Sequence, residues 1–281
     1  MTPPLHPLPA LFLLPRPLNC LITALSVGVG ALTAGQGATP ISWWAALAAA
    51  LIAGAGNTLN DVADLEIDRI NRPDRPLPAG YLSRSTALLL SLALALTGVA
   101  IALWQSPTLG LFAALVVLGL ALYDLWLKRT PLWGNLLVSA LASSAFLFGA
   151  LSAGNLGRSW VPAAFAFLFH LGREIAKDLE DLEGDRAQGT RTLPLSAGEA
   201  LSARLAAGVF LLLALLTWWP WLTGVYGWPY LLPVLGVDLL LLWTARRLWR
   251  ERAAPPQARL GPRLKWGMLL GLLAVVAGEL A

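Results

Sequence analysis

The sequence predicts an all-α membrane protein, a polytopic bundle of nine transmembrane helices. Three observations support this fold class. Of the 281 residues, 57% are hydrophobic and only 13% are charged, with a mean hydropathy of +0.66. Apolar runs of about 18 residues, enough to cross roughly 30 Å of hydrocarbon as a helix, recur along the chain. The basic residues gather in alternate loops, as they do in multi-pass membrane proteins. A soluble protein of this length would need more charge to cover its surface.

The nine predicted spans are 18–36, 41–60, 85–104, 108–123, 133–153, 159–175, 203–223, 230–248 and 266–281. None alternates with period two over a sufficient length, so an outer-membrane barrel is not expected. Helices also satisfy their backbone polar groups internally, as lipid requires. Tryptophans lie at or near the predicted helix ends, as in an aromatic belt: Trp43, Trp44, Trp104, Trp133, Trp160, Trp218, Trp219, Trp221 and Trp228. No linker or low-complexity tail divides the chain, so we expect a single membrane domain over 1–281.

The distribution of positive charge predicts how the bundle is oriented. When the nine spans are threaded in turn, nineteen of the twenty Lys and Arg residues fall on one face and Arg158 alone on the other. Positive residues stay on the cytoplasmic side. We therefore expect a protein of the cytoplasmic membrane with its N-terminus inside and its C-terminus outside. This sorting accounts for the net charge of +4, so nucleic-acid binding is not indicated.

The remaining single residues indicate little chemistry. The Pro-rich start carries no convincing cleavage pattern, which favours an uncleaved first span over a signal peptide. Cys20 is the only cysteine, so an internal disulfide and a cysteine metal site are excluded. His6 and His170 have no partner at ligand spacing. We expect both to be structural or interfacial residues.

Two acidic loops are unusual, and both follow even-numbered spans, so both emerge on the cytoplasmic face. The first, over 57–83, reads NTLNDVADLEIDRINRPDRPLPAGYLS, and the second, over 173–194, reads REIAKDLEDLEGDRAQGTRTLP. Spacings of three and four place the acidic side chains of each loop on one helical face. Such like charges repel and weaken a helix. A divalent cation is the simplest compensation, because Mg²⁺ takes carboxylate oxygens together with substrate phosphates and water.

Basic residues accompany both acidic faces. Arg69, Arg72 and Arg75 follow the first, whereas Lys177, Arg186 and Arg191 interleave with the second. A single acidic helix end would usually be no more than a solvated surface. Two such ends on one side of an apolar bundle, with cations beside them, instead indicate a lipid diphosphate whose head lies at the metal and whose tail lies among the helices.

At this point the motifs resemble a known family. NDVADLEIDRINRPDRPLPAG at 60–80 and REIAKDLEDLEGD at 173–185 are similar to the two Asp-rich motifs of the UbiA superfamily of intramembrane prenyltransferases. The resemblance covers nearly the whole chain. Within the superfamily, RPLNCL at 16–21, LKRTPLWGN at 127–135, FLFGAL at 146–151 and the second motif most resemble the geranylgeranylglycerol-phosphate geranylgeranyltransferases.

The resemblance implies a role for each matching residue. The metal ligands would be Asn60, Asp61, Asp64 and Asp68 from the first motif and Asp178, Asp181 and Asp185 from the second. The substrate-binding residues would be Arg16, Asn19, Arg72, Lys128, Lys177 and Asp238. Asp64, Asp181, Lys128 and Tyr123 would act in catalysis.

Two of the implied residues have more than one interpretation. Tyr123 either positions the diphosphate, or shields a cation, or is an interfacial tyrosine. Asp238 stands within a predicted span, where an ionisable residue is a functional candidate by default. It either contacts the acceptor or accepts hydrogen bonds from neighbouring helices.

The implied reaction is Mg²⁺-dependent transfer of a prenyl group, geranylgeranyl by the resemblance, from its diphosphate to geranylgeranylglyceryl phosphate. The alternative is an aromatic acceptor in quinone or pigment biosynthesis, since the Arg-rich, Ala-rich composition suggests a GC-rich bacterial genome. A secondary transporter is the alternative from another class. Its site would lie near the membrane midplane, whereas these acidic clusters lie at one face. No obligate protein partner is indicated.

Overall fold

The computed structural model describes residues 7–35, 40–251 and 260–281, and over these ranges the chain forms helices and turns without a β-strand. The predicted all-α class is confirmed. His6, Arg252, Arg259 and the last residue of the predicted first span lie outside the described residues.

The long helices are α2 (Pro17–Thr33), α3 (Pro40–Ala63), α5 (Arg84–Gln105), α6 (Pro107–Leu125), α7 (Trp133–Ser152), α8 (Trp160–Glu180), α11 (Glu199–Leu216), α13 (Leu231–Glu251) and α14 (Gly261–Glu279). Shorter helices connect them: α1 (Pro7–Leu13), α4 (Leu65–Asn71), η1 (Leu127–Arg129), α9 (Leu182–Ala187), α10 (Leu193–Ala197), α12 (Trp219–Leu222) and η2 (Trp228–Tyr230). Local signals set several starts. The side chains of Ser83 and Ser106 cap α5 and α6 by accepting hydrogen bonds from the backbone N–H groups of Thr86 and Leu109.

Seven helical stretches among the described residues are long and apolar enough to cross a membrane: 9–33, 41–63, 84–105, 107–129, 133–152, 199–222 and 228–250. They coincide with seven of the nine predicted spans. The other two predicted spans fall in α8 and α14, which are helical but carry more charge. The last two turns of α8 hold the first part of the second Asp motif, up to Glu180, and Arg263 and Lys265 lie in the first turns of α14. The chain is therefore a multi-pass membrane protein, and the nine-span arrangement stays a prediction.

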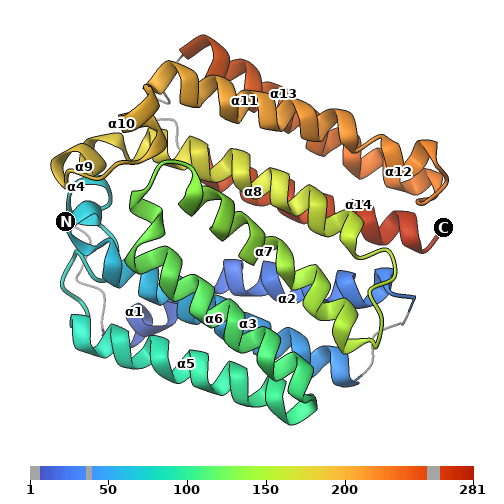
Figure 1. Cartoon of the computed structure of the whole chain (residues 1–281), viewed down its shortest axis with the longest axis horizontal. Helices are drawn as coiled ribbons and strands as arrows, with labels where there is room; N and C mark the ends of the chain where they lie inside the picture. Colours follow the sequence, from blue (N-terminus) through green and yellow to red (C-terminus); the bar gives the residue numbers. More distant parts are fainter. Residues whose placement is uncertain (1–6, 36–39, 252–259) are drawn as a thin grey trace.

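The two Asp motifs meet at one end of the bundle. Figure 1 shows α4, α9 and α10 gathered at this end, whereas α12 and the C-terminus lie at the opposite end. We call the first the motif end and the second the opposite end. At the opposite end Arg158 donates to Glu279 near the end of α14, at 2.8 Å between Nη2 and Oε2. Arg158 therefore lies at the end of the molecule opposite the motifs, as the charge sorting requires.

Small residues let the helices pack closely around the site. A Cβ on Gly30 of α2 would meet the backbone oxygen of Phe146, and one on Gly149 of α7 would meet that of Val27. The helices α2 and α7 therefore approach at backbone distance, as membrane helices do at small residues. Many Leu and Trp side chains remain exposed, among them Trp104, Trp133, Trp228 and Leu232. Such an apolar exterior suits lipid.

Candidate active site

Each Asp motif is built on the same interruption of a helix. Helix α3 ends at Ala63 and α4 begins at Leu65, with Asp64 between them at φ −94° and ψ 6°. Helix α8 ends at Glu180 and α9 begins at Leu182, with Asp181 between them at φ −96° and ψ 5°. The backbone N–H of each Asp still bonds to the carbonyl four residues earlier, in Asn60 and Lys177 respectively. The three-and-four spacing is therefore continued across each junction, and the carboxylates stay on one face.

In the first motif, cations from several elements pair with the carboxylates. Asp61 contacts Arg16 and, at 3.3 Å, Arg75. Asp64 lies 2.6 Å from the Nζ of Lys128. Asp68 contacts Arg75 and lies 3.6 Å from Arg72. The side chains of Asp61 and Asp68 are 3% and 1% exposed, so these are buried ion pairs that lose much if one partner is removed.

The second motif is paired differently. Asp178 accepts a hydrogen bond of 2.8 Å from the side-chain amide of Asn135, and Asp181 lies 2.6 Å from Arg72. Asp185 is buried and forms no ion pair within 4 Å among the described residues. Burial, and then the charge of Asp181, raise the pKa of Asp185 to about 6. The carboxylates of the second motif are therefore less fully paired with cations of the protein than those of the first motif.

Arg72 joins the two motifs, because its guanidinium reaches Asp68 and Asp181 together. The neighbouring Asn71 donates to the backbone oxygen of Asp181 at 3.1 Å. Gly184 of α9 lies against Asn71, where a Cβ would come within 2.5 Å of the amide nitrogen. Helices α4 and α9 therefore pack directly, which brings the two acidic faces to one site.

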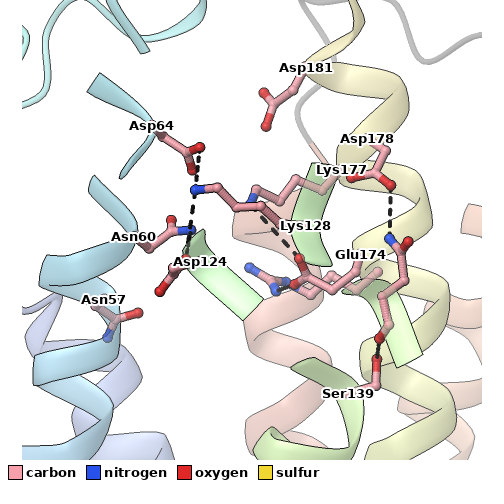
Figure 2. Close-up of polar contacts among 12 residues, drawn as sticks. Asn57, Asn60, Asp64, Asp124, Lys128, Ser139, Glu174, Lys177, Asp178 and Asp181 are labelled. Atoms are coloured by element: carbon pink, nitrogen blue, oxygen red, sulfur yellow. Dashed lines mark hydrogen bonds and ion pairs between the residues drawn. The ribbon is translucent and has the colours of Figure 1, made fainter. Parts of the chain in front are cut away.

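Lys128 and Lys177 lie between the two Asp junctions. Figure 2 shows Asp64 and Asp181 on either side of the two ammonium groups. Lys177 lies 3.8 Å from Glu174, and Lys128 lies 3.7 Å from Asp124. Burial alone would raise the pKa of Asp64, but the charges of Lys128 and Lys177 outweigh it and hold that pKa below its usual value. Asp64 is therefore ionised at neutral pH.

Arg16 and Asn19 extend the site to the start of α2. Arg16 adopts a left-handed backbone conformation, with φ 57° and ψ 74°, immediately before Pro17. Such a conformation is costly for a residue other than glycine and is common at functional sites. The guanidinium contacts Asp61 and lies 3.4 Å from the Asn60 oxygen. Asn19 donates to Asn57, 3.3 Å between Nδ2 and Oδ1, and thereby ties α2 to α3.

A cavity of about 600 Å³ opens beneath these groups. Its polar end is lined by Arg16, Asn60, Arg72, Tyr123 and Lys177, among others. Its remaining wall is apolar and comes chiefly from α2, α3, α6 and α7: Ile22, Ile52, Phe112, Val116, Leu120, Leu141, Ala145 and Phe148. The predicted carboxylate ligands lie behind the cations at the polar end rather than on the wall itself. The cavity therefore suits a molecule with an anionic head and an apolar tail.

Four polar residues of this site were given no role by the sequence reasoning, although Arg75 was noted as a cation beside the first motif. Asp124 is buried on α6, accepts a 2.8 Å hydrogen bond from Asn60 and contacts Lys128. Glu174, Arg75 and Asn135 hold predicted site residues in place. The signal for Asp124 was a carboxylate at the end of an apolar helix, four residues before Lys128. Asn135 carried no such signal, because one amide at a helix start is common.

Two predicted residues had alternative interpretations. Tyr123 is buried on the cavity wall, which favours a role in positioning substrate over an interfacial one. Asp238 lies apart from the cavity. Its Oδ1 accepts a hydrogen bond of 3.0 Å from Thr217 at the end of α11, which favours the structural interpretation of this residue.

The comparison with known proteins decides the family. The model of the UbiA prenyltransferase family matches residues 20–272. The chain belongs to this UbiA family. Both Asp junctions lie within the matched residues, so this UbiA protein is a prenyltransferase, and the predicted family and enzyme class are confirmed.

Relatives of this UbiA protein match it over almost its whole length. A digeranylgeranylglyceryl phosphate synthase of Methanopyrus kandleri is 42% identical over 95% of this chain and 98% of its own. The digeranylgeranylglyceryl phosphate synthase of Halobacterium salinarum is 40% identical over 95% of this chain and 96% of its own. A solved structure concerning digeranylgeranylglyceryl phosphate synthase in membranes is 29% identical, with a TM-score of 0.73 over 97% and 98% of the two chains. A UbiA homologue from Archaeoglobus fulgidus bound to GPP and Mg²⁺ shares the fold at 17% identity and a TM-score of 0.67, over 96% and 98%.

Proposed function

We propose that this protein catalyses the Mg²⁺-dependent transfer of a geranylgeranyl group from geranylgeranyl diphosphate to geranylgeranylglyceryl phosphate. The observation that carries the proposal is the pair of Asp junctions facing one another across Lys128 and Lys177, at the polar end of an apolar cavity. The acceptor is supported by relatives named digeranylgeranylglyceryl phosphate synthase that are about as long as this chain.

The donor atoms at this end suit Mg²⁺, which prefers oxygen ligands and shares them with phosphates. Among the described residues, no three His, Cys, Asp or Glu side chains are already arranged to hold a metal, because Lys128 and Arg72 pair with Asp64 and Asp181. These cations also suit a diphosphate. We propose that they turn to the substrate and release Asp64, Asp181 and their acidic neighbours as ligands. Bound Mg²⁺ would supply charge neutralisation on the leaving diphosphate.

The side chains then have separate tasks. Arg16, Arg72, Lys128 and Lys177 bind the diphosphate, and Asp124 keeps Asn60 and Lys128 in position. Positive charge around the leaving group stabilises the developing anion as the bond between C1 and oxygen breaks. The acceptor hydroxyl attacks C1 and passes its proton to the departing diphosphate. The apolar wall excludes water, which would otherwise capture the carbocation-like carbon.

We further propose that α8 and α14 also cross the membrane, giving nine spans, and that the motif end faces the cytoplasm. Helix α8 carries its charges at the motif end, as α14 does with Arg263 and Lys265, whereas Glu279 of α14 lies at the opposite end beside Arg158. Water is available at both ends of a spanning helix. Reporter fusions at the two chain ends test this arrangement. Opposite readouts support an odd number of spans, and matching readouts contradict it.

The acceptor is tested by mass spectrometry of products. Purified protein would be given geranylgeranyl diphosphate, Mg²⁺ and a panel comprising geranylgeranylglyceryl phosphate, its dephosphorylated form, 4-hydroxybenzoate and a naphthoate. We expect the phosphorylated lipid to react much faster than the others. Preferential prenylation of an aromatic ring would instead make the protein an aromatic prenyltransferase, with the same fold and Asp motifs.

A further inference from the structure

Two cations at the polar end of the cavity are not among those assigned to the diphosphate. Arg173 of α8 and Lys265 of α14 both line the polar end. Lys265 has no ion pair within 4 Å among the described residues. One nitrogen of Arg173 contacts Glu174, which Lys177 shares, while the buried Nε of Arg173 has no hydrogen-bond partner. The protein therefore leaves positive charge uncompensated between α8 and α14.

The surroundings of Lys265 are short of negative charge. Burial lowers the pKa of this ammonium group, and the positive charges of Arg173, Arg16 and Arg75 lower it further. Arg16 and Arg75 are already paired with Asp61, whereas no carboxylate of the described ranges lies within 4 Å of the Lys265 ammonium group. Lys265 is half-buried, and a partly desolvated cation without a counter-charge is unfavourable, so an anionic ligand would stabilise it.

Other basic residues on the neighbouring segments point elsewhere. Arg247 and Arg263 lie over the Trp243 ring, at 5.5 and 4.9 Å from its centroid, and Arg246 and Arg250 are exposed. These four suit a role in orientation or in attraction of anionic lipid. Among the described basic residues of 246–265, Lys265 is the one on the cavity wall.

The helix faces that carry the two cations continue into a second, apolar chamber. One turn from Arg173, Phe169 and His170 line this chamber, and one turn from Lys265, Met268 does so. The chamber has a volume of about 90 Å³. It adjoins the main cavity, since His170, Met268, Ile22, Ser26 and Ala142 line both. An anionic head between Arg173 and Lys265 would thus place an attached apolar chain at the chamber entrance.

We infer that the mouth between α8 and α14 is the acceptor seat, where Lys265 and Arg173 bind the phosphate of a single-tailed isoprenoid glycerol phosphate and the chamber takes the near part of its tail. This inference rests on the proposed function. It separates the two substrates, because the donor tail takes the wall of α2, α3, α6 and α7 while the acceptor lies against α8 and α14. The reacting ends of the two substrates then meet below Lys128 and Lys177.

Equilibrium binding of radiolabelled geranylgeranylglyceryl phosphate tests the seat, with purified protein in chelator and without donor. Lys265→Met should weaken acceptor binding about tenfold or more, since a charge-assisted contact to phosphate is lost. Binding of geranylgeranyl diphosphate should change less than about twofold. Lys265→Arg should restore acceptor binding. Arg263→Met, on the same helix but over Trp243, should match the wild type.

The possible results distinguish a failure of the proposed function from a failure of the acceptor seat. Wild-type protein that binds geranylgeranyl diphosphate but not the phosphorylated acceptor would overturn the proposed function, and the seat with it. Suppose instead that the wild-type protein binds both the diphosphate and the phosphorylated acceptor. A Lys265→Met variant that keeps its affinity for both ligands, or loses affinity for both equally, would then overturn the acceptor seat alone.

The chamber has its own variant. A Cβ on Gly271 meets no atom within 4 Å, and Gly271 lines the chamber, so Gly271→Leu should fill it and shift binding severalfold toward acceptors with shorter tails. Gly208→Leu is the control, because Gly208 of α11 is exposed and equally free of neighbours. Unchanged tail preference in Gly271→Leu would contradict the chamber assignment.

Discussion

The two Asp motifs share a backbone design and differ in how their charge is balanced. Asp64 and Asp181 occupy equivalent junctions with nearly identical dihedral angles. In the first motif Asp61, Asp64 and Asp68 each contact a cation. In the second, Asp178 is held by an amide, and the cation on Asp181 is Arg72, which comes from the first loop. Cations from several elements thus neutralise the carboxylates of the first motif. The second motif takes its cation, Arg72, from the loop of the first.

This difference indicates how the site could change on binding substrate. A diphosphate can draw Lys128 and Arg72 away from Asp64 and Asp181 because its charge exceeds that of a carboxylate. Asp178 would stay in place, since its partner Asn135 is neutral and is attracted to a diphosphate less strongly than a cation is. We therefore expect the junction aspartates to dominate activity and their neighbours to contribute less.

The largest expected effect comes from the junctions themselves. Asp64→Asn and Asp181→Asn should each lower the transfer rate by roughly 10²–10³-fold or more, because each removes charge that holds the metal near the leaving group. Steady-state transfer at saturating Mg²⁺ measures this. Glu66→Gln is the matched control, because Glu66 lies on α4 but is 58% exposed and pairs only with Arg69 among the described residues. A Glu66 variant as inactive as Asp64→Asn would point to a general loss of structure.

The link between the motifs is tested next. Arg72→Met should weaken donor binding and lower thermal stability, since it leaves the buried Asp68 and Asp181 without a shared cation. Breaking a buried pair costs about 3–5 kcal/mol. A double-mutant cycle of Arg72→Met with Asp181→Asn, followed by thermal unfolding, should show strong coupling. Arg69→Met, which removes an exposed pair with Glu66, should change stability by less than about 1 kcal/mol. Additive effects in the Arg72 cycle would refute the link.

A smaller effect is expected at Asp124. Asp124→Asn keeps the shape of the side chain and an oxygen that can accept from Asn60, but it removes the charge that holds Lys128. Transfer should fall about 10–100-fold, as for residues that orient metal-site ligands, with the loss mainly in kcat. Wild-type kinetics in this variant would mean that Lys128 is positioned by Asp64 alone.

The smallest effect is expected at Asp238. Asp238→Asn retains an oxygen that can accept from Thr217, and the residue lies away from the cavity. Transfer and the KM for each substrate should stay within about twofold, and stability should change by about 1 kcal/mol or less. A raised KM for the acceptor would restore the substrate-binding interpretation of Asp238.

Much of this site could be predicted from the sequence because its signals are local. Three-and-four spacing placed Asp61, Asp64 and Asp68 on one face, and the structure continues that face across the α3–α4 junction. The nine apolar runs anticipated where the long helices lie. Contacts between distant segments could not be predicted this way. The pairing of Arg72 with Asp181 spans 109 residues, and no single-segment pattern encodes it.

Contacts between distant segments also determine which cations neutralise the carboxylates of the two motifs. The clustered carboxylates, for which the sequence indicates Mg²⁺, also pair with Lys128, Arg72 and Arg75 in the structure. Those cations lie before or after the acidic runs and reach them only through the fold. Likewise, the basic segment 246–265 gave no sign that Lys265 would face inward while Arg263 packs on Trp243, because helix rotation is set by packing.

The central claim is that both junctions act on one metal–diphosphate complex. It is tested most directly by calorimetric titration of the protein with geranylgeranyl thiolodiphosphate, an unreactive donor analogue, with and without Mg²⁺. Wild-type protein should bind more tightly with Mg²⁺, and Asp64→Asn and Asp181→Asn should each abolish that enhancement. Enhancement that survives in either variant would show that its junction does not serve the metal, and would contradict the account.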